Sequence, residues 1–263
     1  MLRKLAVSIL FILCTVLYTH AQSSVRVQEN NAFGYGEKIT YKIKYDLYFN
    51  FNVGEVNFSI ENKPAVIAGN DCIHITGIGS TYGFYDPFYK VRDRYETYIE
   101  KNSLLPLLFI RDVHEGKFAF GEYVIFNQSK NIAVSKKRTQ KIPKFTQDVL
   151  SSIYYARTLD YADAKPGQAF LLTTFIDDST YRVGVRYIGR ETIETDLGKV
   201  RCIRLQPILI VDRLFKSENG MTLWVTDDAN HIPVRIESGI SVGKIRADLA
   251  SWSGLKNPMA AVK

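Results

Sequence analysis

The sequence predicts a protein built mainly of antiparallel β-strands, arranged as a sandwich, a barrel or a strongly curved sheet. Apolar and polar side chains alternate with a period of two along several segments, which is the pattern of a strand with one buried and one solvated face. Turn-forming residues such as Gly, Asn and Asp separate these segments. The sequence shows no alternation of strands with helices that would indicate parallel βαβ units, so mostly antiparallel pairing is expected.

The clearest alternation lies in residues 38–47, and segments 54–61 and 244–249 repeat it. In the first of these, Ile39, Tyr41, Ile43, Tyr45 and Leu47 alternate with lysine, threonine and aspartate. Further strands are expected at 71–79, 91–100, 105–113, 117–127, 131–138, 168–176, 180–190, 199–206, 221–227 and 232–240. Clean alternation of this kind favours sheets with one solvated face.

Residues 148–161 depart from the period of two. Val149, Leu150, Ile153, Tyr154 and Ala156 recur at helical spacing. We therefore expect one helix near residues 146–160, packed on the sheet. Thr146 or Asp148 can cap its N-terminus, because a short oxygen-bearing side chain accepts bonds from the free N–H groups there. Pro166 and Gly167 oppose its continuation past residue 165.

The N-terminus is typical of a cleavable secretory signal over residues 1–21. Arg3 and Lys4 precede an uncharged apolar run of 13 residues, Leu5–Leu17, and small residues stand at the −3 and −1 positions before Gln22. The run is shorter than the roughly 20 residues that cross a bilayer. An uncleaved membrane anchor is the alternative. The remaining chain is expected to hold a flexible segment (22–32), a single β-rich domain (33–252) and a loose tail (253–263), with no transmembrane span.

The charge and the export signal together limit the partners. The whole chain has a formal charge of +7, and loss of Arg3 and Lys4 with the signal lowers it to +5. This surplus permits a weak attraction to anionic lipid or polysaccharide, whereas nucleic acid is not an expected partner of an exported protein. The basic segment Lys130–Lys144 is interpreted as a solvated loop or strand edge. The periplasm is the expected location, and the extracellular medium is the alternative.

Few residues are candidates for catalysis, and no cofactor or metal is predicted. A nucleophilic hydrolase needs Ser or Cys with His and a carboxylate, and no Gly-x-Ser-x-Gly motif is present. We interpret the three histidines beyond the signal, His74, His114 and His231, as structural. The acidic pairs Asp177–Asp178 and Asp227–Asp228 are interpreted as turn residues, although a turn at 227–230 could bind calcium.

Two cysteines remain after the signal, Cys72 and Cys202, each within an expected strand. An exported protein could join them in a disulfide if their Cα atoms lie within about 7 Å. Two separate buried thiols are the alternative, and the sequence does not decide between them.

The aromatic residues are the most unusual feature of the composition. The chain has 16 tyrosines and 15 phenylalanines, and several gather in residues 82–89, which follow neither strand nor helix periodicity. This loop either plugs the core or forms the rim of a binding site. The candidate ligand-binding residues are therefore Tyr82, Phe84, Tyr85, Phe88, Tyr154 and Arg157. Arg157 either bonds the sheet or contacts a ligand head group at the mouth of a cavity.

Three blocks in order make the chain similar to domain-of-unknown-function family 3108. They are Gly36–Glu37 with Tyr41, Tyr45 and Gly54–Glu55; Asp148, Ser151, Tyr154, Tyr155 and Arg157; and Leu223–Asp228 with Pro233–Val234 and Gly243–Ile245. The resemblance spans roughly residues 33–250. It implies an exported protein whose curved antiparallel sheet is rolled into an incomplete barrel or spiral. That shape is similar to the periplasmic lipoprotein carriers, in which a concave apolar face receives acyl chains and a helix acts as lid or plug.

These observations favour a non-catalytic envelope protein that binds a lipophilic ligand or an acylated protein partner in a curved β-sheet. A rolled sheet points alternate residues inward, so a wide one leaves an apolar hollow unless side chains fill it. The first alternative is an envelope scaffold that has a filled core and binds another envelope protein. The second is a hydrolase of cell wall or polysaccharide, for which no carboxylate pair can be nominated.

Overall fold

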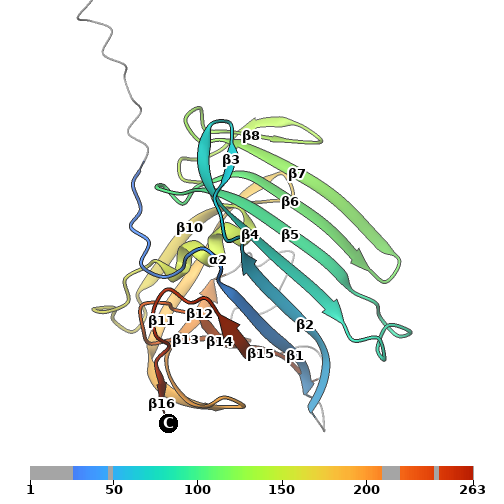
Figure 1. The fold of residues 1–263 in the computed structure, drawn as a ribbon, viewed down its shortest axis with the longest axis vertical. Coiled ribbons are helices and arrows are strands. Elements are labelled where there is room, and N and C mark those ends of the chain that lie inside the picture. The colour runs from blue at the N-terminus through green and yellow to red at the C-terminus, as the bar shows by residue number, and fades with distance from the viewer. Residues whose placement is uncertain (1–25, 47–49, 209–219, 240–242, 263) are drawn as a thin grey trace, which may run out of the picture.

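The computed structural model describes residues 26–46, 50–208, 220–239 and 243–262 (Figure 1). The predicted signal peptide lies outside these residues. All sixteen strands of the described chain belong to one antiparallel sheet. In chain order they are β1 (Lys38–Asp46), β2 (Asn50–Ile60), β3 (Ala65–Ile67), β4 (Asn70–Thr81), β5 (Arg92–Glu100), β6 (Pro106–Glu115), β7 (Phe118–Asn127), β8 (Ile132–Ser135), β9 (Thr139–Lys141), β10 (Ala169–Ile176), β11 (Ser179–Thr195), β12 (Gly198–Ile208), β13 (Met221–Thr226), β14 (Pro233–Gly239), β15 (Lys244–Ser253) and β16 (Ala261–Val262).

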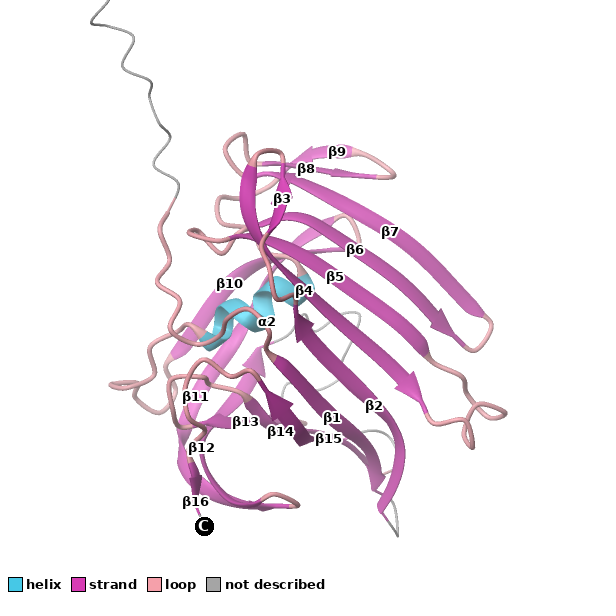
Figure 2. Ribbon diagram, viewed as in Figure 1, coloured by secondary structure: helices cyan, strands magenta, loops and turns pink. Residues whose placement is uncertain are grey.

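The sheet is strongly curved and does not close into a barrel, which confirms the predicted fold class. Its strand order is β10-β11-β12-β13-β14-β15-β1-β2-β4-β5-β6-β7-β8-β9, with β3 on β4 and β16 on β12. The chain therefore starts at the middle of the sheet, reaches the β9 edge, crosses to the β10 edge and returns to pair β15 with β1. In Figure 2 the sheet wraps around the helix.

The helix α2 (Val149–Arg157) starts at a capping box. The Asp148 carboxylate accepts a bond of 2.8 Å from the backbone N–H of Ser151, and the Ser151 hydroxyl accepts one of 2.8 Å from the N–H of Asp148. Thr97 of β5 donates its hydroxyl to the same carboxylate at 2.6 Å, so the cap is also tied to the sheet. The helix ends at Arg157, earlier than the sequence pattern suggests, because Thr158 takes the C-cap position.

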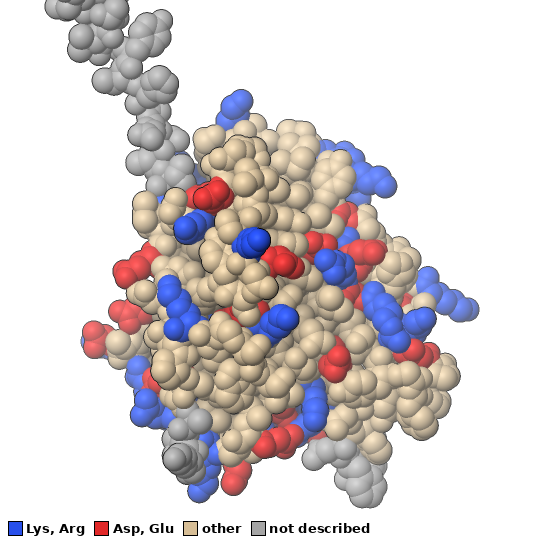
Figure 3. Space-filling model, in the orientation of Figure 1, with Lys and Arg blue, Asp and Glu red and all other residues tan. Residues whose placement is uncertain are grey.

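The main apolar core fills the space between α2 and the strands β4–β8. Leu150, Tyr154 and Tyr155 of the helix pack there against inward residues such as Ile75 and Phe126. The outer face carries the polar half of the alternation. On β1, Lys44 lies 3.0 Å from Asp248, which also pairs with Arg235 of β14 at 2.6 Å. Charges of both signs are interspersed over the face shown in Figure 3.

The two edges of the sheet approach each other where the chain crosses between them. Gln147, just before the helix, forms a parallel bridge with Thr174 of β10. The turn at Asp177–Asp178 reaches the opposite half of the sheet, where Arg111 of β6 contacts Asp177 at 2.6 Å. Gln140 of β9 donates to the carbonyl of Asp178 at 3.0 Å. Side chains and one short bridge therefore join this seam.

Several details differ from the expected strands. β3, β9 and β16 are short strands that no run of alternating residues marks, and β11 extends over 17 residues through an irregularity at Gly189. The segment 253–263, expected to be a loose tail, pairs β16 with β12, and Asn257 bonds Asn31 and Asn230.

The structure also bears on the two cysteines and on the predicted lack of a transmembrane span. Cys72 on β4 and Cys202 on β12 are both buried and free, so the alternative of a disulfide between them is not realised. No helix within the described part of the chain has the length and apolar character to cross a membrane.

Candidate functional site

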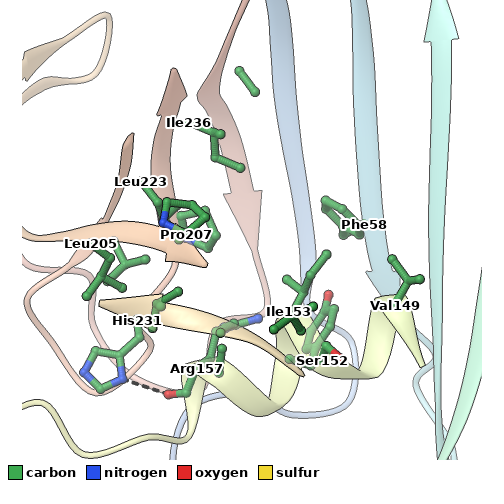
Figure 4. A pocket seen from close by; sticks show the side chains of 18 of the residues that line it. Phe58, Val149, Ser152, Ile153, Arg157, Leu205, Pro207, Leu223, His231 and Ile236 are labelled. Carbon is green, nitrogen blue, oxygen red and sulfur yellow. Dashed lines mark hydrogen bonds between the residues drawn. The ribbon is translucent and has the colours of Figure 1, made fainter. Parts of the chain in front are cut away.

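A cavity of about 470 Å³ lies on the side of α2 that faces away from the filled core. The helix forms one wall, and the inner faces of β10–β15, β1 and β2 form the others (Figure 4). The helix thus divides the interior of the curved sheet into a packed half and a hollow half.

The lining follows from the two periodicities of the sequence. Ile39, Tyr41 and Ile43 alternate along β1 and all face the cavity. On α2, Val149, Ile153 and Ala156 share one face because they are four and three residues apart. Ile153 is 40 % exposed, so this face of the helix is not covered by packing. The hollow is therefore continuous with solvent.

Most polar groups of the lining bond within the protein. The Ser152 hydroxyl donates to the Asp148 carbonyl at 2.6 Å and lies 2.7 Å from the Thr174 hydroxyl. The Tyr161 hydroxyl donates to the Ala156 carbonyl at 3.0 Å. His231 places Nδ1 2.7 Å from the Arg157 carbonyl, so that nitrogen carries the proton (Figure 4). The surface offered to a ligand is consequently hydrocarbon.

A buried ion pair forms the floor of the cavity. Arg157 donates to both carboxylate oxygens of Glu37, at 2.6 and 2.8 Å. Its remaining bonds go to the carbonyls of Asn230 at 2.9 Å and Ala32 at 3.2 Å. Burial acts to lower the pKa of Arg157, but the hydrogen bonds and charge of Glu37 outweigh it and raise the pKa above its ordinary value. The pair joins the N-terminal segment, the helix and the turn after β13.

Two neighbouring groups, Asp148 at the start of the helix and Tyr154 within it, have strongly raised pKa values. Burial raises the pKa of Asp148 to about 6, against the opposing effect of its bonds from Ser151 and Thr97. Burial also raises the pKa of Tyr154 well above its ordinary value, and the negative charge of Glu37 acts in the same direction. At neutral pH the tyrosine is therefore a neutral hydroxyl.

The predicted site residues separate into two groups. Tyr154 and Arg157 belong to the lining of the cavity, whereas the loop 82–89 contributes nothing to it. That segment is a loop, as expected, and Phe84 and Phe88 are 78 % and 80 % exposed, so they do not plug the core. Arg157 bonds Glu37 rather than presenting its guanidinium at the mouth. A ligand-binding role for Tyr82, Phe84, Tyr85, Phe88, Tyr154 and Arg157 stays a prediction.

The acidic pairs and histidines have structural partners. Asp227 pairs with Arg190 and Arg201 at 3.2 and 3.1 Å, and Asp228 accepts a bond from the N–H of Asn230. His74 lies 2.8 Å from Glu96 of β5. Within the described ranges, no group of three or more His, Cys, Asp or Glu residues is placed to hold a metal ion.

Sequence reasoning did not identify several residues of the site. Phe58, Ile236 and Ala247 line the cavity, and their inward direction was readable from alternation, but their position around a hollow was not. Glu37 was visible only within the Gly36–Glu37 block, without its partner. Glu37 and Arg157 are 120 positions apart, and no local pattern of the sequence signals their contact.

The family description "Protein of unknown function (DUF3108)" matches residues 40–250. The chain belongs to the DUF3108 family. This confirms the resemblance and leaves the activity open. The DUF3108 protein is similar in fold to a β-barrel-like protein of domain of unknown function DUF1849 from Brucella abortus, with a TM-score of 0.55 and 11 % identity over 87 % of this chain and 99 % of that one. At this identity the likeness concerns the fold alone.

A second solved structure is more distant. It is a protein with a YmcC-like fold from Bacteroides fragilis, 11 % identical over 87 % of the DUF3108 chain and 100 % of its own, with a TM-score of 0.34. A score at this level carries no argument about the present protein. No curated protein matches the chain.

Proposed function

We propose that this DUF3108 protein is a non-catalytic protein of the cell envelope that holds the hydrocarbon part of a lipophilic ligand in the cavity beside α2. The observation that carries the proposal is the lining: apolar side chains from nine elements surround a hollow, and most of its polar groups already bond within the protein. The predicted export signal supports the envelope as its location, with the periplasm first and the extracellular medium second.

The volume and chemistry of the cavity indicate an acyl chain. Sites for small molecules occupy roughly 300–1,000 Å³, and this cavity of about 470 Å³ falls within that range. No carboxylate or lysine lies among the described residues of the lining, and its one guanidinium is bound to Glu37. A charged head group would therefore stay at the mouth, where water solvates it. The bound acyl chain could belong to a free lipid or to an acylated protein partner.

The bonding of the polar lining residues supports a role without catalysis. A nucleophilic serine needs a base within hydrogen-bond reach. Ser152 instead donates its hydroxyl hydrogen to a main-chain carbonyl, and the Nδ1–H of His231 donates to the carbonyl of Arg157. These two side chains hold the helix and the turn after β13 in place.

Uptake of an apolar fluorescent probe, N-phenyl-1-naphthylamine, by the mature chain tests the proposal. Ala247 pairs with Ile43 and Ile236 on the neighbouring strands, and all three line the cavity. Ala247→Trp should fill the hollow and lower probe affinity by at least about tenfold, since more than about 1.4 kcal/mol of apolar contact is lost. Ala169→Trp, on the exposed side of β10, is the matched control and should leave uptake unchanged.

Native mass spectrometry of protein taken from its own envelope should show a bound lipid. A clean apo mass together with no probe uptake would contradict the proposal and favour the alternative of an envelope scaffold. Equal uptake by Ala247→Trp and the unaltered protein would place the probe elsewhere and contradict it as well.

A further inference from the structure

The loop between β4 and β5 has a fixed shape. Asp86 accepts a bond from Thr81 at 2.8 Å and pairs with Arg92 at 2.7 Å, which closes the base of the loop. The backbone N–H of Tyr85 bonds the Tyr82 carbonyl at 2.8 Å, and that of Phe88 bonds the Tyr85 carbonyl at 2.9 Å. Polar residues thus hold the loop from within, and its aromatic side chains are left on the outside.

Four exposed rings lie on this loop and at the start of β7, and we call this set the aromatic corner. It consists of Phe84, Phe88, Tyr89 and Phe118, with exposed fractions of 78 %, 80 %, 55 % and 58 %. The β6–β7 turn joins the loop through a bond of 2.7 Å from the Gly116 N–H to the Lys90 carbonyl. A contiguous apolar surface in water is costly and marks a site of interaction.

Charges of both signs lie beside the corner, and two of the basic ones take part in no ion pair among the described residues. Lys90 and Lys117 are exposed, and neither takes part in the ion pairs of the described chain. Of the acids beside them, Asp86 pairs with Arg92, whereas within the described ranges Glu115 and Asp93 accept bonds only from neutral donors, the Tyr89 hydroxyl at 3.4 Å and the His114 N–H at 2.9 Å. In Figure 3 the region where this loop projects is mostly uncharged, with both basic and acidic residues next to it.

The corner lies at the same end of the sheet as the outer part of the cavity. Ile43, which lines the cavity, pairs with Gly54, and Gly54 pairs with Thr81, the last residue before the loop. The loop therefore leaves the sheet at the level of Ile43, two strands away. A flat surface that contacts the corner would face this end of the hollow.

We infer that the aromatic corner docks this protein on an anionic lipid bilayer. Aromatic rings partition into the interface between head groups and acyl chains, and lysines beside them are attracted to anionic head groups. The combination of exposed rings and two unpaired lysines, carried by the β4–β5 loop and the adjacent β6–β7 turn, fits this surface. Docking itself is independent of the cavity; that it brings the mouth of the cavity to the lipid rests on the proposed function.

Flotation of the mature chain with vesicles tests the inference. Vesicles of phosphatidylcholine with phosphatidylglycerol should carry the protein upward, and vesicles of phosphatidylcholine alone should carry less. Phe84→Ser with Phe88→Ser should lower binding by at least about tenfold. Lys90→Glu with Lys117→Glu should remove the preference for anionic vesicles, because each lysine contributes about fivefold.

Matched variants separate docking from folding and from ligand binding. Val66→Ser, at a 66 % exposed position on β3, should float as the unaltered protein does. Ala247→Trp, which blocks the cavity, should float normally even where it takes up no probe. The melting temperature should be unchanged in the loop variants; if Phe84 and Phe88 prove necessary for folding, Phe118→Ser alone should lower binding.

Three results would overturn the inference. The first is failure of the unaltered protein to float with anionic vesicles, and the second is equal flotation by the Phe84 and Phe88 variant. The third is a concentration-dependent dimer that this variant abolishes while vesicle binding stays the same, which would assign the corner to a second copy of the chain.

Discussion

Replacing Glu37 by Gln should destabilise the protein more than removing one charge from any solvent-exposed ion pair. The side chain of Glu37 is 0 % exposed and that of Arg157 is 4 % exposed. The substitution keeps the shape of the side chain but removes the negative charge. The guanidinium is then left buried with only neutral partners, among them the carbonyls of Ala32 and Asn230.

The magnitude follows from the burial of the pair. Removing one partner of a buried ion pair costs about 3–5 kcal/mol, because the remaining charge stays desolvated. A typical domain has a free energy of unfolding of about 5–15 kcal/mol, so the loss would be a large fraction of it. An exposed pair contributes only about 0–1 kcal/mol.

Urea unfolding of the mature chain, followed by tryptophan fluorescence, measures the difference. Glu237→Gln is the matched control, since it removes the partner of Lys244, whose side chain is 57 % exposed, at a similar distance of 2.7 Å. Glu37→Leu combined with Arg157→Met should recover part of the loss, because no charge then stays unpaired. A loss at Glu37 below about 1 kcal/mol, or equal to that at Glu237, would refute the reasoning.

Three further outcomes are expected. Saturated fatty acids should bind about fourfold more tightly for each added methylene until the cavity is full, because each buried methylene contributes about 0.8 kcal/mol; calorimetry showing no dependence on chain length would speak against the hollow as the site. Because the folded-state pKa of Asp148 is raised from 3.8 to about 6, its stabilising contribution is full below pH about 4 and is lost as pH rises through about 6. The stability of the unaltered protein relative to Asp148→Asn should therefore fall by about 3 kcal/mol over that range, and a constant difference in urea titrations would exclude the shift. Burial raises the pKa of Cys72 to about 11 and of Cys202 to about 12, so neither should react with iodoacetamide at pH 8 until the protein unfolds; rapid labelling of the native protein would contradict their burial.

Local periodicity accounts for most of what the sequence could predict about the fold. Alternation placed β1, β2 and β15 to within a few residues, since one face of each is buried and the other carries charge. The helical spacing of Val149 and Ile153 located α2 for the same reason. The short strands β3 and β9 have three residues each, too few for a period to be visible.

The site needed information that no local pattern contains. Which strands surround the hollow depends on the strand order, and β1 pairs with β15 across nearly the whole chain. The exposure of Phe84 and the burial of Arg157 were each one of two alternatives that the sequence left open. The burial of Arg157 was decided by a long-range partner, Glu37, and the loop of Phe84 is held by the pair of Asp86 with Arg92, six residues apart, which no periodicity marks.

The seam between the β9 and β10 edges has a mechanical consequence. A closed barrel has a fixed circumference, because widening it must break a complete ladder of hydrogen bonds between two strands. Here the circumference is completed by the Gln147 bridge and by side chains such as Arg111 on the Asp177 turn. Widening the circumference would therefore break these few side-chain contacts and the bridge, while each strand stays paired with its neighbour in the sheet.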